Sequence, residues 1–116
     1  NKVISPSCCC GLERWRDWLR FMKKGQSPWL GHDPNPWVEK VKGLVRVWSD
    51  TKAKSFLIDF EKSKFEAELS KVQQDLSAFL ARSEEWAGRV GCSEPTKLSG
   101  KFDECFSISR WQRFLR

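Results

Sequence analysis

The chain has 116 residues, a formal net charge of +6, 40% hydrophobic side chains and 31% charged side chains. This composition excludes a disordered segment, because enough apolar surface is present to build a core, and the length predicts one domain. No apolar run approaches the roughly 18 residues that a bilayer-crossing helix needs, so no transmembrane helix is expected within these residues. The seven Trp and eight Phe residues, with no Tyr, are expected to fill the core for the most part.

Residues 1–10 form the first segment, which has no hydrophobic periodicity and is predicted to be an extended arm that ends in a cysteine triplet. Residues 11–24 follow as a strong amphipathic helix, because apolar side chains recur at helical spacing. The apolar stripe consists of Leu12, Trp15, Leu19 and Met22. The opposite side of this helix is basic and includes Arg14, Arg16 and Arg20. Gly25 is expected to end the helix.

Residues 25–36 contain three prolines and two glycines, and they predict a rigid loop between the first two helices. Asn35 and Pro36 are expected to open a second helix that runs to Trp48. The β-branched valines and the interior Gly43 also fit strands. A helix over 36–48 is nevertheless favoured, because spacing near 3.5 residues describes the whole segment better than strict alternation does.

The longest helical pattern runs over residues 51–87, with an N-cap expected at Ser49, Asp50 or Thr51. A regular apolar stripe begins at Phe65, and it is out of phase with the apolar residues that precede it. A bend or break is therefore expected near residues 61–65, unless the helix forms an extended rod in a dimer.

The last segments are a loop over residues 88–100 and a closing helix over residues 101–115. The predicted fold is thus all-α, a small bundle of four helices with one long central helix, in which residues 11–116 form a single helical domain. The two ends of the chain are basic and the centre is acidic, so the basic ends either pair with the central helix or meet in one positive patch.

The five cysteines are Cys8, Cys9, Cys10, Cys92 and Cys105. Neighbouring thiols in an extended chain do not readily bond one another. In an oxidising compartment two of the triplet are expected to bridge Cys92 and Cys105. In a reducing compartment the triplet, set before a basic helix, instead predicts S-acylation at a membrane. No metal site is expected, because the sequence has neither a C-x-x-C motif nor a histidine pair.

His32 is the single histidine, and Asp33 follows it in the proline-rich loop. No nucleophile motif and no glycine-rich phosphate loop accompany this pair, so neither an enzymatic role nor a cofactor is expected. Binding of nucleic acid through the Arg and Lys faces is a weaker hypothesis, because the interleaved Trp residues lie on the apolar helix stripe.

The function that the sequence favours is a non-enzymatic interaction domain that docks a protein partner and is secreted. The expected contact residues are Trp29 and His32 on the rigid loop, together with Arg14, Arg16 and Arg20. The alternative is a peripheral membrane module on the cytoplasmic face of a membrane, in which the acylated triplet and the basic helix lie on an anionic surface. Homodimerisation is compatible with either function.

Overall fold

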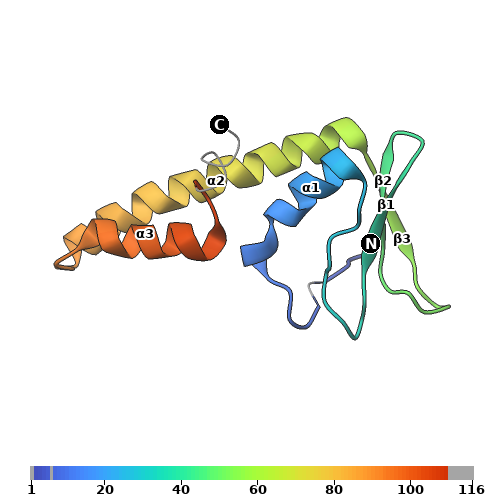
Figure 1. Ribbon diagram of the computed structural model, residues 1–116, viewed down its shortest axis with the longest axis horizontal. Helices are drawn as coiled ribbons and strands as arrows, with labels where there is room; N and C mark the ends of the chain where they lie inside the picture. Colours follow the sequence, from blue (N-terminus) through green and yellow to red (C-terminus); the bar gives the residue numbers. More distant parts are fainter. Residues whose placement is uncertain (1, 6, 110–116) are drawn as a thin grey trace. The chain divides into compact units, whose positions relative to one another are not determined.

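The computed structural model describes residues 2–5 and 7–109 (Figure 1). Within that part of the chain, three α-helices, a short 3-10 helix and three strands follow one another. In chain order they are η1 (Leu12–Arg14), α1 (Arg16–Lys24), β1 (Trp37–Val41), β2 (Leu44–Trp48), β3 (Leu57–Glu61), α2 (Lys62–Arg89) and α3 (Pro95–Phe106). The three strands form one antiparallel sheet in the order β1-β2-β3, so the prediction of an all-α four-helix bundle is wrong.

The chain divides into two compact units, Asn1–Leu69 and Ser70–Arg116, and each is described by itself. Helix α2 begins in the first unit and continues into the second. The first predicted helix is present in shortened form, because residues 12–14 are a 3-10 turn and α1 begins at Arg16. Gly25 ends α1 as predicted, in the left-handed conformation at φ 78°.

The predicted helix over residues 36–48 is instead a β-hairpin. Lys42 and Gly43 both have positive φ, 48° and 79°, which is the geometry of a tight two-residue hairpin turn. The turn pairs Val41 with Leu44 and Val38 with Val47. A two-residue turn offsets the alternation of one strand from that of the next. As a result, the apolar residues of the two strands taken together recur at a spacing close to that of a helix, although the side chains of each strand alternate between the two faces of the sheet.

The predicted helix start at Thr51 is also wrong, because residues 51–56 form a loop that leads into β3. The backbone N–H of Ser49 donates to the Phe56 carbonyl at 2.8 Å, and the Phe56 N–H donates to the Ser49 hydroxyl at 2.9 Å. These bonds close the β2–β3 connection. The chain passes from strand to helix between Glu61 and Lys62, which is where the change in apolar phase had predicted a break.

The core of the first unit lies between α1 and one face of the sheet (Figure 1). Phe21 of α1 is completely buried and packs on three strand residues, Val38, Val45 and Val47. The Trp18 ring meets Phe21 edge-on, with ring centroids 6.2 Å apart. Burial of this face is what stabilises the sheet, because a hairpin alone is marginal in water.

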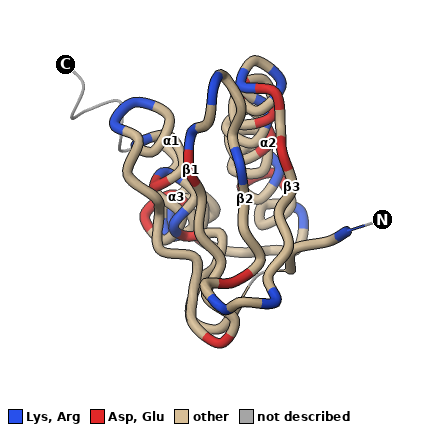
Figure 2. Tube along the Cα trace, turned by 90° about the vertical axis from the view of Figure 1, so that its right-hand side faces the viewer, with Lys and Arg blue, Asp and Glu red and all other residues tan. Residues whose placement is uncertain are grey.

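The side chains on the outer face of the sheet form hydrogen bonds and ring contacts with one another. Trp37 and Trp48 stack across the hairpin at 5.6 Å, and the Trp48 indole N–H donates to Glu39 at 2.7 Å. Arg46 donates two hydrogen bonds to the Asp59 carboxylate, at 2.8 and 3.0 Å. Figure 2 shows the resulting pattern, in which acidic positions on β1 and β3 flank a basic one on β2.

The second unit consists of residues 70–89 of α2, a short turn and α3. Gly91, at φ 84°, turns the chain, and Pro95 opens α3 in its first turn. The two helices meet through the Phe79 and Phe102 rings, whose centroids lie 5.2 Å apart. The predicted closing helix over 101–115 has the wrong bounds, since α3 spans Pro95–Phe106, and its expected residues 110–115 lie outside the described residues. The single domain expected over residues 11–116 is wrong in its all-helical character, and its boundary stays a prediction.

Candidate functional site

The N-terminal arm and the proline-rich loop lie against each other in the first unit. Cys8 and His32 form an isolated antiparallel bridge, and the Ser7 hydroxyl donates to the carbonyl oxygens of His32 and Pro34. Gly31 makes this approach sterically feasible. A Cβ atom at position 31 would lie 2.5 Å from the Cys8 carbonyl oxygen, and the residue has φ 104°. The contact therefore requires glycine.

Trp29 projects from this loop with 43% of its surface exposed. Its carbonyl accepts a hydrogen bond from the Cys10 thiol at 3.4 Å. On the preceding side, the Ser27 hydroxyl accepts from the Val38 N–H at 3.1 Å and donates to the Pro28 carbonyl, which ties the loop to β1. An exposed aromatic ring thus stands on a backbone that is held from both sides.

The predicted contact residues Arg14 and His32 lie beside Trp29. The Arg14 guanidinium carbon is 5.9 Å from the Trp29 ring centroid, and the His32 ring centroid is 6.2 Å from it. We call the surface of Trp29, His32 and Arg14 the loop surface. The hydrogen bond from the Val38 N–H to the Ser27 hydroxyl ties the loop that carries Trp29 and His32 to β1.

The two other predicted arginines have different environments. Arg20 is exposed and shares Asp17 with Arg14, at 3.1 and 2.9 Å respectively. Arg16 is 5% exposed, and its guanidinium carbon lies 4.5 Å from the Trp15 ring centroid. Arg16 is therefore buried and unsuited to contact a partner, whereas Arg14 and Arg20 are accessible.

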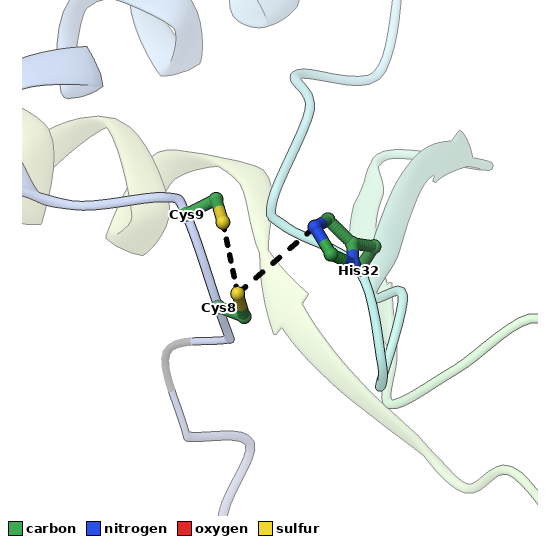
Figure 3. A group of neighbouring side chains, drawn as sticks. All are labelled: Cys8, Cys9 and His32. Carbon is green, nitrogen blue, oxygen red and sulfur yellow. Dashed lines mark hydrogen bonds between the residues drawn. The ribbon is translucent and has the colours of Figure 1, made fainter.

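The cysteine triplet divides into two environments. Cys8 and Cys9 are exposed, with their Sγ atoms 2.8 Å apart, and the Cys8 Sγ lies 4.0 Å from the His32 Nε2 (Figure 3). The hydrogen bond with Cys9, followed by partial desolvation, raises the pKa of the Cys8 thiol. Cys10 is half-buried, and burial together with the nearby Glu13 carboxylate raises the pKa of its thiol.

Cys92 and Cys105 lie in the second unit and are exposed, and the structure, which describes all five cysteines, has no disulfide bond among them. Disulfide bridges from the triplet to Cys92 and Cys105 stay a prediction, as does acylation of Cys8, Cys9 and Cys10. The convergence of Cys8, Cys9 and His32 is what sequence reasoning missed. The signal that could have found it is Gly31, because a glycine next to the single histidine marks a close backbone approach.

A cavity of about 590 Å³ adjoins the arm within the first unit. Its walls come from the arm, α1, the proline-rich loop and the sheet, and they include Ile4, Trp18, Leu30, Ile58, Phe60 and Phe65. Since the arm forms one wall, whatever fixes the arm also fixes the shape of this cavity.

Comparisons with protein-family models, with curated proteins and with solved structures found no match to this chain. Among the residues described, no helix combines the length and the apolar content that crossing a membrane requires. The functional argument therefore rests on the geometry of the arm and the loop.

Proposed function

We propose that this protein is a non-enzymatic interaction domain that docks a protein partner through the loop surface. The observation that carries the proposal is the 43% exposure of Trp29 on a loop whose backbone is held by hydrogen bonds on both sides. A large ring that is already ordered loses little conformational entropy on binding. Trp and Arg are also the residues most often found to dominate binding energy at interfaces.

The chemistry of the loop surface defines the partner. Together, η1 and α1 have more exposed basic than exposed acidic side chains, namely Arg14, Arg20, Lys23 and Lys24 against Glu13, while the Asp17 side chain is 13% exposed. A complementary partner presents an apolar side chain to cover Trp29 and a carboxylate near Arg14 or Arg20. We therefore expect an acidic protein segment with an apolar anchor residue.

The test selects binding peptides from a displayed random library on the wild-type chain and then measures the Kd of each peptide for the wild type and for Trp29→Ala. The selected peptides are expected to combine acidic and large apolar residues, and their Kd should rise about 30-fold on Trp29→Ala, which corresponds to roughly 2 kcal/mol. Trp86→Ala is the matched control, because Trp86 is 54% exposed in α2 and distant in sequence from the loop. Peptides that bind Trp29→Ala as tightly as the wild type would contradict the proposal.

A second measurement tests the alternative function, a peripheral membrane-binding module. Arg14 and Arg20 are exposed, and so are the thiols of Cys8 and Cys9, so a membrane-binding module would use these groups. Binding to vesicles of phosphatidylcholine and phosphatidylserine that disappears on Arg14→Glu with Arg20→Glu would replace the docking proposal. Arg16 is left unchanged in this test, because reversing a buried charge would test folding instead.

A further inference from the structure

Three donor atoms converge where the arm meets the loop. The two Sγ atoms of Cys8 and Cys9 and a ring nitrogen of His32 all lie within 4.8 Å of one another (Figure 3). Two thiolates and one imidazole form a ligand set typical of Zn²⁺ and of other soft or borderline ions, and a poor one for Mg²⁺ or Ca²⁺.

The separations of these atoms fit a shared ion after small side-chain rotations. Two sulfur ligands at about 2.3 Å from a tetrahedral Zn²⁺ lie roughly 3.8 Å apart, and a sulfur and a nitrogen ligand lie roughly 3.5 Å apart. The observed distance between the two Sγ atoms, 2.8 Å, is shorter than the first value. The observed distance from the Cys8 Sγ to the His32 Nε2, 4.0 Å, is longer than the second. Rotations about the Cα–Cβ bonds change both separations without moving the backbone.

The backbone already holds the donors together. Cys8 and His32 are 24 residues apart in sequence, yet they are bridge partners, and Gly31 permits the close approach. Cys9 has φ 68°, in the left-handed region that non-glycine residues seldom adopt. Side chains of neighbouring residues in an extended strand point to opposite sides. The left-handed turn at Cys9 instead leaves the two thiols in contact on one side.

We propose that Cys8, Cys9 and His32 bind one Zn²⁺ ion, with a fourth coordination position open to solvent. All three side chains are exposed, so the ion has direct access and the open position faces water. Binding replaces the two thiol protons, which leave to solvent as both cysteines ligate as thiolates, and the imidazole binds as the neutral base.

The ion would cross-link the arm to the loop and so close a long segment of chain. Such a link stabilises the folded unit by restricting the unfolded chain, as a disulfide does. It would also fix the arm as a wall of the adjacent cavity. This inference concerns the chain alone, and it does not depend on the docking of a protein partner.

The first test titrates Zn²⁺ into the reduced full chain in competition with a chromophoric chelator. We expect one Zn²⁺ per chain, with at least tenfold weaker binding for Cys9→Ser and for His32→Gln. Cys10→Ser is the matched control. The Cys10 thiol is directed to the Trp29 carbonyl, so this substitution should leave the Zn²⁺ affinity unchanged. The thermal midpoint of the wild type should rise on addition of Zn²⁺ and that of His32→Gln should not.

Co²⁺ supplies a readout of the ligand set itself. The wild-type complex should show thiolate-to-metal charge-transfer absorption that weakens in Cys9→Ser, and the ligand-field bands should shift in His32→Gln. His32→Cys keeps a soft donor at this position and should restore binding, which separates loss of a ligand from loss of the fold.

Unchanged Zn²⁺ affinity in His32→Gln would overturn the proposal. So would Zn²⁺ binding that is lost in Cys92→Ser or Cys105→Ser but kept in Cys9→Ser, because those thiols lie outside the cluster. Circular dichroism of each metal-free variant, compared with that of the metal-free wild type, establishes that the fold is retained. If the fold of His32→Gln is lost, the comparison of Cys9→Ser with Cys10→Ser decides the matter.

Discussion

The two units of this chain bury their side chains by different means. In the first unit, Phe21 of α1 is covered by strand residues further along the chain, of which Val38 is the nearest in sequence, 17 residues away. In the second unit, burial comes from two consecutive helices joined by a short turn. The loop surface and the Cys8–Cys9–His32 cluster both belong to the first unit. Their geometry therefore depends on contacts between distant segments, whereas that of the second unit depends on neighbouring ones.

The largest expected difference between the units follows from substitution in each core. Phe21→Ala should cost about 3–5 kcal/mol of unfolding free energy, because Phe21 is fully buried between α1 and the sheet. Leu76→Ala in α2, where Leu76 is 7% exposed, should cost about 2–3 kcal/mol. Urea denaturation followed by hydrogen exchange measures both and assigns the loss to a unit. Equal loss of exchange protection in both units for both variants would show that the two units unfold as one.

The arm–loop contact can be broken without touching the core. Gly31→Ala should cost about 2–3 kcal/mol, because the new methyl group meets the Cys8 carbonyl and the φ of 104° is strained for alanine. Gly43→Ala is the control, since Gly43 has φ 79° but open space around it, and should cost about 1 kcal/mol. Thermal denaturation compares the two variants. A cost for Gly31→Ala no greater than that for Gly43→Ala would contradict the close approach.

In the second unit, substitution of Gly100 by alanine should have the opposite effect on stability. Gly100 lies in the interior of α3, where a Cβ atom meets nothing within 4 Å. Gly100→Ala should therefore stabilise the protein by about 0.5–1 kcal/mol, because alanine loses less backbone entropy in a helix. A rise in the thermal midpoint checks this, and a fall would mean that an unseen neighbour approaches α3 at this position.

The pH dependence of stability should come in part from the outer face of the sheet. Hydrogen bonds from Arg46 lower the pKa of Asp59 below its usual value. A carboxylate with a lowered folded-state pKa stabilises the protein above its unfolded pKa of about 3.9 and loses that contribution as the pH falls through the folded value. Asp59→Asn should therefore reduce the loss of stability below about pH 4. Denaturation curves across the acid range measure it, and Arg46→Gln should give the same flattening if the pair is its source.

The sequence predicted the helical parts of the molecule better than the sheet. Helical periodicity from Phe65 onward lies in α2, and Gly25 ends α1, because both signals depend on residues within a few positions of one another. The hairpin was missed because its pairing partners lie across a turn. Because the turn at Lys42 and Gly43 has two residues, the apolar residues of the two strands recur about every 3.5 positions along the sequence, as they would in a helix.

In the candidate site, too, the sequence identified individual residues but not the long-range contacts between them. Trp29, His32 and Arg14 were identified singly by residue type, yet their assembly depends on how the arm meets the loop. Arg16 was grouped with the exposed arginines because helical spacing does not reveal which side chain stacks inward on Trp15. The Cys8–His32 bridge is likewise a long-range contact, and no local spacing in the sequence encodes it.

Comparison of two tryptophans gives the sharpest separation of folding from binding, and one of them has the smallest expected effect on stability. Trp48 stacks on Trp37 and donates to Glu39, so Trp48→Ala should cost about 2 kcal/mol of stability. Trp29→Ala should cost no more than about 0.5 kcal/mol, because Trp29 is the more exposed of the two, at 43%, and its backbone hydrogen bond persists in alanine. Urea denaturation of both variants checks the difference. A loss of stability for Trp29→Ala as large as that for Trp48→Ala would make Trp29 a structural residue and remove the basis for docking through the loop surface, since a ring held for folding is not free to be covered by a partner.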